Sequence, residues 1–184
     1  NMKKFSSERL LCLAKENLSA DPPRLEIPCI VSHELSKRGD RASNKRLREL
    51  FRTFTDGKRP FWLQRSRKLI LEKTRVDKKR AGRGAGAIKV YMFLTFHEKS
   101  KFPYGVYIGQ TYRKERIRFE QHKQGVKAGN IRGGKHIQLL PSFTQHLKNP
   151  HPNREQALEL ETKIYELLCK AKINGLPKHR IFGG

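Results

Sequence analysis

Acidic residues, cysteines and long apolar runs are all scarce in this sequence. Its 17 Asp and Glu stand against 41 Lys and Arg, which gives a formal net charge of +24. A balance that extreme indicates a polyanionic partner, most often nucleic acid. An anionic membrane surface or a heparin-like polymer is the competing partner.

The other two scarcities exclude whole classes of protein. An odd number of cysteines at wide intervals, Cys12, Cys29 and Cys169, argues against a disulfide framework or a zinc site and favours a reducing or redox-neutral setting. No apolar run approaches the ~20 residues of a membrane-spanning helix, and the first residues are charged too early for a secretory signal. We therefore expect an intracellular protein, in the cytoplasm or nucleoid, with no membrane partner.

Positive charge runs through both halves of the chain. Residues 1–87 hold 23 basic and 10 acidic residues, and residues 88–184 hold 18 and 7. Both halves should therefore contact a phosphate backbone, with an affinity that falls steeply as salt is added. The 184 residues are enough for one domain with a real core and a smaller second region.

Residues 1–80 predict a basic, mainly helical region that contacts DNA. Helices are predicted at 6–18, with Ser6 or Ser7 as cap, at 42–54, and from about Pro60 onward. The prolines within 21–30 predict an irregular segment. None of these helices shows a convincing helix-turn-helix turn, so the sequence predicts DNA contact without identifying a helix that reads bases.

A linker rich in Gly, Lys and Arg is predicted at 77–87. Arg80 and Arg83 in such a segment suit a DNA minor groove, but they suit a solvated charged linker equally well. We expect a second domain at 88–184.

The second region predicts alternating strands and helices. Strands are predicted at 88–96 and 105–111 with a hairpin loop between them, followed by a helix that Gly125 ends. Residues 136–147 predict a third strand or a short helix. The most periodic segment is a helix that Asn153 caps and Gly175 follows. The pattern is that of a mixed α/β (α+β) domain.

Five short pieces of this region, in order, resemble the GIY-YIG nuclease family. They are Val90-Tyr91, Tyr107-Ile108-Gly109, Arg118 with His122 in RFEQH, Glu161 in LETKIYELL, and Asn174 in KINGLP. Lys89 stands where the family's first signature has glycine, and the interval between the two tyrosines is a few residues longer than usual. The resemblance covers roughly residues 88–184.

The resemblance implies a small, mostly antiparallel sheet flanked by helices and a divalent-metal-dependent DNA endonuclease that hydrolyses phosphodiester bonds. It implies that Arg118 binds phosphate, that Glu161 holds one Mg²⁺ or Mn²⁺, and that Asn174 supports the metal side. Tyr91 or Tyr107 would deprotonate the attacking water, and His122 would orient water or bind phosphate. Double-stranded DNA is the expected partner. A restriction, homing or mobile-element, repair or toxin role stays open, and so does a homodimer.

The residue pattern adds an argument for Glu161 that does not depend on the family. In a helix, the residues three and four positions from it are Ala157, Leu158, Ile164 and Tyr165, whereas those of Glu159 are Glu155, Gln156, Thr162 and Lys163. Glu161 should therefore face the packed side. A carboxylate there is costly unless a cation or a metal ion accompanies it.

The chemistry of a tyrosine base needs a perturbed pKa. A phenol with a pKa near 10 is a poor base at neutral pH, and we expect the surrounding Lys and Arg, or a metal ion, to lower it. Arg116 is the alternative to Arg118 as the phosphate ligand. Further nucleic-acid contacts are expected at Arg80, Arg83, Arg113, Arg116, Lys123 and Arg132.

Two alternatives to an enzyme stay open. One is a non-enzymatic nucleic-acid-binding protein, such as a ribosome-associated or RNA-packaging protein, which fits the charge and the size. The other is a catalytically inactive nuclease relative that only binds. The first alternative would not need an inward-facing Glu161.

Overall fold

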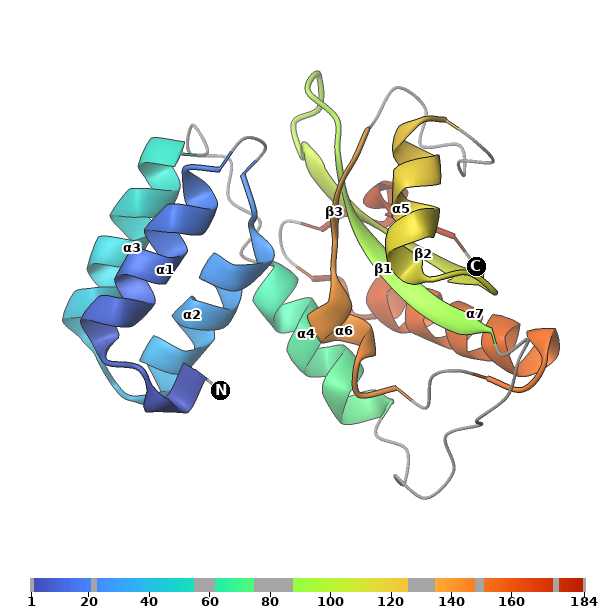
Figure 1. Ribbon diagram of the computed structural model, residues 1–184, viewed down its shortest axis with the longest axis horizontal. Helices are drawn as coiled ribbons and strands as arrows, with labels where there is room; N and C mark the ends of the chain where they lie inside the picture. Colours follow the sequence, from blue (N-terminus) through green and yellow to red (C-terminus); the bar gives the residue numbers. More distant parts are fainter. Residues whose placement is uncertain are drawn as a thin grey trace. The chain divides into compact units, whose positions relative to one another are not determined.

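The computed structural model in Figure 1 describes residues 2–20, 23–54, 62–74, 88–125, 135–147, 151–173 and 176–183. Contacts divide the chain into two units, Asn1–Gln64 (unit 1) and Arg65–Gly184 (unit 2). The predicted linker at 77–87 lies outside the described residues. None of the described helices has the length and apolar character needed to span a lipid bilayer.

Unit 1 is helical. Its elements are the 3-10 helix η1 (Met2–Lys4) and the helices α1 (Ser7–Leu18), α2 (Glu26–Lys37) and α3 (Arg41–Phe54), and the chain then enters α4 (Trp62–Lys73). Ser6 caps α1 by accepting a hydrogen bond from the Arg9 backbone N–H, which selects between the two predicted caps. Leu47 and Phe51 of α3 are buried, as the apolar face of that helix predicts.

Helix α2 corrects the prediction of an irregular segment at 21–30. The helix begins at Glu26, so Pro28 is its third residue. The first backbone N–H groups of a helix have no acceptor within the helix, so a proline in the first turn removes no hydrogen bond. The prediction was wrong for 26–30 because it treated a first-turn proline as an interior one.

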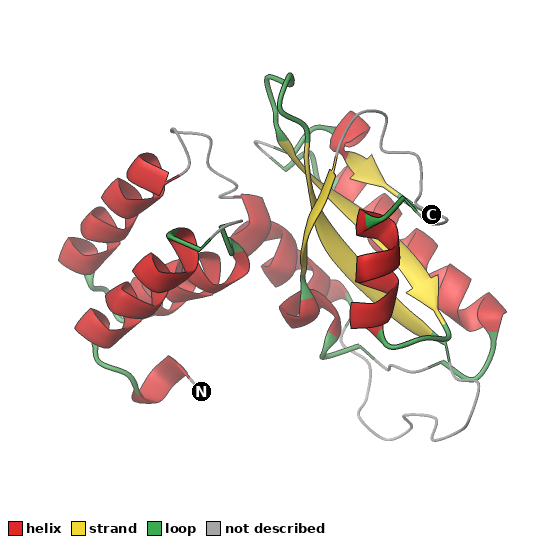
Figure 2. Cartoon of the chain, turned by 45° about the horizontal axis from the view of Figure 1, so that its top comes forward, coloured by secondary structure: helices red, strands yellow, loops and turns green. Residues whose placement is uncertain are grey.

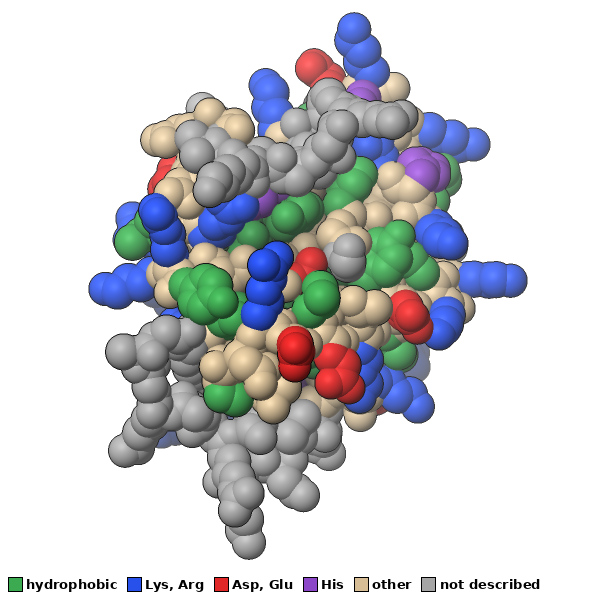
Figure 3. All heavy atoms as spheres, turned by 90° about the vertical axis from the view of Figure 1, so that its right-hand side faces the viewer, with side chains coloured by type: hydrophobic (Ala, Val, Ile, Leu, Met, Phe, Trp, Pro, Cys, Tyr) green, Lys and Arg blue, Asp and Glu red, His purple; other side chains and the backbone are tan. Residues whose placement is uncertain are grey.

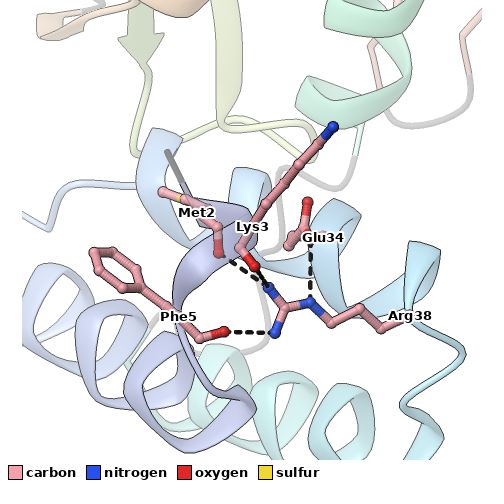
Figure 4. A network of polar contacts seen from close by, with 5 residues as sticks. All are labelled: Met2, Lys3, Phe5, Glu34 and Arg38. Carbon is pink, nitrogen blue, oxygen red and sulfur yellow. Dashed lines mark hydrogen bonds and ion pairs between the residues drawn. The ribbon is translucent and has the colours of Figure 1, made fainter.

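The N-terminal segment is attached to α2 through Arg38 (Figure 4). The guanidinium donates to the backbone carbonyls of Met2, Lys3 and Phe5 at 2.6 to 3.2 Å. It also pairs with Glu34, one turn earlier in α2, at 3.1 Å. One arginine thus holds three carbonyls of the N-terminal segment against the end of α2.

Unit 2 is built on a four-stranded sheet. Its strands are β1 (Lys89–Phe96), β2 (Tyr104–Thr111), β3 (Lys135–Leu139) and β4 (Ile181–Phe182), in the order β3-β1-β2-β4. β1 is antiparallel to both β2 and β3, whereas the two-residue β4 is parallel to β2. The α+β class is confirmed, and β4 makes the sheet mixed.

Helices cover both faces of this sheet. They are α5 (Glu115–Lys123), α6 (Pro141–Thr144), α7 (Arg154–Lys170) and the 3-10 helix η2 (Lys178–Arg180). α5 lies over one face and α7 over the other (Figures 1 and 2). Gly125 follows α5 with a φ of 77°, which favours glycine, and Asn153 caps α7 as predicted. Residues 135–147 form both a strand and a short helix.

Candidate active site

The two candidate tyrosines are brought together by the register of β1 and β2. Tyr91 pairs with Gly109, and Phe93 pairs with Tyr107. Because side chains alternate along a strand, Tyr91, Phe93 and Tyr107 share one face of the sheet. The ring centroids of Tyr91 and Tyr107 lie 6.2 Å apart.

Gly109 makes this approach possible. A Cβ at this position would lie 2.7 Å from the Tyr91 hydroxyl oxygen and 2.8 Å from Cε1 of Tyr107. Both distances are shorter than van der Waals contact, and both involve rings packed in the interior. The glycine that follows Tyr107-Ile108 is therefore a steric requirement of the tyrosine pair.

A chain of hydrogen bonds extends from Tyr91 through two histidines. The Tyr91 hydroxyl lies 3.2 Å from Nε2 of His122, and Nδ1 of His122 lies 3.2 Å from Nε2 of His136. His122 is 3% exposed, so it is not a surface histidine. His136, on β3, was missed because a single histidine in an apolar strand is most simply a core residue; its one signal is that it follows a basic, glycine-rich loop.

Both histidines are neutral near pH 7. Burial, followed by the positive charge of Arg118, lowers the pKa of His122 and of His136 to about 4. A neutral imidazole has one N–H donor and one acceptor nitrogen. The two rings can therefore relay hydrogen bonds in one direction along the chain.

The surroundings of His136 favour one direction. Its Nδ1 is buried and has no hydrogen-bond partner among the described residues. A buried N–H without an acceptor is costlier than an unfilled lone pair, so we assign the proton to Nε2. His136 then donates to His122, His122 donates to Tyr91, and the Tyr91 hydroxyl hydrogen is left for Tyr107.

Burial dominates the ionisation of both tyrosines. It raises the pKa of Tyr91 and of Tyr107, and the nearby Arg118 opposes this shift without reversing it. The prediction that surrounding Lys and Arg lower the phenol pKa is therefore wrong. Lys89, the nearest lysine in sequence, pairs with Glu115 at 3.7 Å.

Arg118 is distinguished from the other cations of α5 by its surroundings. It is half-buried, its Nη1 lies 3.4 Å from Oε1 of Gln121, and its charge acts on both tyrosines and both histidines. Arg113, Arg116 and Lys123 are exposed. Arg116 instead lines a hollow of about 530 Å³ on the outer side of α5. The structure therefore brings Arg118, and not Arg116, to the tyrosines.

Glu161 faces inward, as its helix position predicts. It is 7% exposed and shares the buried side of α7 with Ala157, Ile164 and Leu168, whereas Glu159 is exposed. Leu158, which was also expected on the packed side, is 44% exposed. After burial, the charge of the Glu161 carboxylate is the next cause of the raised pKa of Tyr107, so this charge acts on the phenol.

The donor set fits magnesium better than it fits zinc. No group of three or more His, Cys, Asp or Glu side chains converges within the described part of the chain. Magnesium is often bound through only one or two carboxylates together with waters and substrate phosphate. A single buried carboxylate beside a phenol, Glu161 beside Tyr107, meets that requirement.

Arg180 is a further cation on this face, and sequence reasoning missed it. Gly105 lies two residues before Tyr107, and a Cβ there would lie 2.5 Å from the Arg180 carbonyl oxygen and 3.2 Å from Arg180 Cβ. The Cβ of Arg180 therefore lies on the same face of the sheet as Tyr91 and Tyr107. It is 8% exposed, and no hydrogen bond or ion pair joins it to any described residue. In the sequence it was indistinguishable from its exposed neighbours Lys178 and His179.

Four predicted residues lie outside the described residues: Arg80, Arg83, Arg132 and Asn174. The three cysteines, Cys12, Cys29 and Cys169, are free thiols. No family model matches the chain, and no curated protein or solved structure matches it. The case for a function therefore depends on the site itself.

Proposed function

We propose that this chain is a divalent-metal-dependent DNA endonuclease with a GIY-YIG-like site in unit 2. The observation that carries the proposal is the meeting of two tyrosines, two neutral histidines, Arg118 and Glu161 on a four-stranded sheet. These residues come from five separate elements. A structural core has no need of a half-buried Arg118, a buried Arg180 and a buried Glu161 packed against one sheet, because each charge is costly to remove from water.

Arg118 and Arg180 bind the phosphate in this proposal. A guanidinium can hold a phosphate through two hydrogen bonds and neutralise charge that grows on it. The basic surface guides the DNA backbone toward them: on the face in Figure 3, Lys and Arg side chains surround a smaller acidic group and exposed apolar side chains.

Glu161 holds the metal ion. When bound, magnesium or manganese neutralises charge on the scissile phosphate, stabilises the leaving oxygen and favours the ionised form of a nearby phenol. Asn174 remains a predicted support of this side of the site.

Tyr107 is the better candidate for the base. Burial and Glu161 raise the pKa of Tyr107, and the hydrogen bond from Tyr91 opposes part of this shift, whereas the bond to Tyr107 adds to the raised pKa of Tyr91. The histidine chain fixes the direction of that bond. Ionised Tyr107 takes a proton from water, the water oxygen bonds to phosphorus, and the bond from phosphorus to the 3′ oxygen breaks. The products are a 5′-phosphate and a 3′-hydroxyl that takes its proton from solvent.

The test is nicking of supercoiled plasmid with and without Mg²⁺. Glu161→Ala is expected to reduce Mg²⁺-dependent nicking about 100-fold or more, because it removes the metal ligand. Glu159→Ala is the matched control, since it removes the same charge from the exposed side of α7. Normal nicking by Glu161→Ala, or its loss in Glu159→Ala, would contradict the assignment.

A non-enzymatic nucleic-acid-binding protein, including an inactive nuclease relative, is the second candidate. The raised pKa of both tyrosines favours it, because a phenol that stays protonated cannot act as a base. DNA binding with no Mg²⁺-dependent nicking across supercoiled, linear and branched DNA would support this candidate over the nuclease.

A further inference from the structure

Helix α3 of unit 1 has a continuous stripe of positive charge. Arg41, Lys45, Arg48 and Arg52 are all exposed and follow one another at intervals of four, three and four residues. At 100° per residue these intervals place all four side chains within about 60° of one another around the helix. Leu47 and Phe51, about 130° and 90° around the helix from the centre of this group, are buried. We call these four residues the basic stripe.

The charges of the basic stripe are not compensated locally. Within the described residues, no ion pair involves any of the four, whereas six other cations pair with acids, as Arg9 does with Glu16. The sole acidic residue of α3 is Glu49. Four like charges along three turns repel one another, so the arrangement is stabilised by an external anion.

A hollow lies beside the stripe. It has a volume of about 590 Å³ and is lined by Ser36, Gly39, Arg41, Asn44, Lys45 and Arg48. Three of the six are stripe residues, and the side chains of Ser36 and Asn44 add hydrogen-bonding groups. Gly39 has a φ of 70° in the short connection between α2 and α3, which brings the end of α2 next to the stripe. The hollow is therefore a positively charged depression next to α3 in which a phosphate group could bind.

Geometry favours duplex DNA among polyanions. A helix that binds a membrane surface needs an exposed apolar face, but the apolar side of α3 is buried in unit 1. The major groove of B-form DNA is about 12 Å wide and admits a helix, whereas the deep, narrow major groove of A-form RNA does not. We propose that α3 docks in a groove of double-stranded DNA, with the basic stripe on its phosphates.

The proposal concerns unit 1 alone and does not depend on whether unit 2 is a nuclease. The test therefore uses the full chain with a labelled DNA duplex in EDTA, where no bond is cut. The measured quantity is the slope of log Kobs against log salt concentration. Each lost phosphate contact lowers the magnitude of this slope by about 0.9, so Arg48→Ala/Arg52→Ala should lower it by about 1.8.

The matched control is Arg9→Ala/Lys15→Ala, which removes the same charge from exposed positions of α1 in the same unit. Its slope should equal that of the wild type. Circular dichroism of each variant checks that the helices are retained. Equal slopes for the stripe variant and the control would overturn the proposal.

Further ligands test the choice of partner. Duplex RNA, heparin and anionic phosphatidylserine vesicles are titrated under the same conditions. The stripe substitutions should weaken DNA binding at least threefold more than they weaken binding of the other three. An equal loss for all four ligands would show a general affinity for anions and would overturn the assignment to duplex DNA.

Discussion

At the scale of single residues, burial has a larger effect than charge in the candidate site. Arg118 lies close enough to act on Tyr91 and Tyr107, and yet both phenols have a raised pKa because they are removed from water. Burial and Arg118 act in the same direction on the histidines and keep them neutral. The tyrosines and histidines are therefore neutral groups between the Arg118 cation and the Glu161 carboxylate, and catalysis would need a further positive charge to ionise a tyrosine.

The neutral histidines predict an acid-sensitive fold. With a pKa of about 4 in the folded chain and about 6.5 when unfolded, each histidine binds more protons in the unfolded state between these values. Stability from this source is complete above pH 6.5 and is lost as the pH falls toward 4, by about 2 to 3 kcal/mol per histidine. Urea midpoints measured between pH 7.5 and 4.5 report the loss.

A double variant distinguishes the histidines' contribution to this loss of stability from that of carboxylates that titrate in the same pH range. His122→Gln/His136→Gln should show a shallower fall in urea midpoint than the wild type, whatever its stability at neutral pH. Parallel curves for the two proteins would mean that the histidine pair does not account for the acid sensitivity.

Substitution of Gly109 is expected to act through a steric clash with the two tyrosines rather than through backbone φ strain. Gly109→Ala places a Cβ against both tyrosines and should cost about 1 to 3 kcal/mol of unfolding free energy and reduce nicking. Gly125→Ala is the comparison, because that glycine has open space around it but a φ of 77°, and it should cost about 1 kcal/mol with nicking retained. If Gly125→Ala impaired nicking as much as Gly109→Ala, the tyrosine pair would not be the cause.

At the scale of elements, position within an element matters more than the residue type. Glu161 and Glu159 are two residues apart in α7, and one is buried while the other is exposed. Arg118 and Arg116 are separated in the same way on α5. For the two glutamates the sequence predicts the difference, because helical spacing alone separates a packed side from a wet one. For the two arginines it left Arg116 as the alternative to Arg118.

Helix α2 gives a prediction at this scale. Pro28→Ala should cost about 1 to 2 kcal/mol of unfolding free energy, because the first turn needs no N–H at that position and the loss is only that of two buried ring methylenes. Ser32→Pro, in the middle of the same helix, should cost about 3 kcal/mol or more, because it removes a hydrogen bond and introduces a clash. Urea denaturation of both variants measures the difference, and equal costs would contradict the place of Pro28 in the first turn.

At the scale of the whole molecule, the two units present different chemistry to an anion. Unit 1 has a regular stripe of exposed cations and a hollow beside it, a surface suited to a long polymer. Unit 2 has a half-buried Arg118 whose charge acts on the paired tyrosines and a buried Arg180 on the same face of the sheet, a site suited to one phosphate. The two proposals are tested by different measurements. Substitutions in unit 1 should lower the salt dependence of DNA binding, whereas Glu161→Ala in unit 2 should abolish metal-dependent nicking.

The sequence by itself determined what depends on composition and short-range periodicity. The strands at β1 and β2, the capped helices α1 and α7 and the inward Glu161 all follow from such patterns. They could be predicted because alternation and helical spacing are set by the backbone near each residue.

Only the tertiary structure decided what depends on contacts between distant segments. His136 and Arg180 join the tyrosine face through the pairing of β3 with β1 and of β4 with β2, and neither carries a local pattern that marks it. The raised phenol pKa is decided in the same way. It reflects how many other segments cover each ring, and burial of that kind is a property of the packed domain rather than of any stretch of chain.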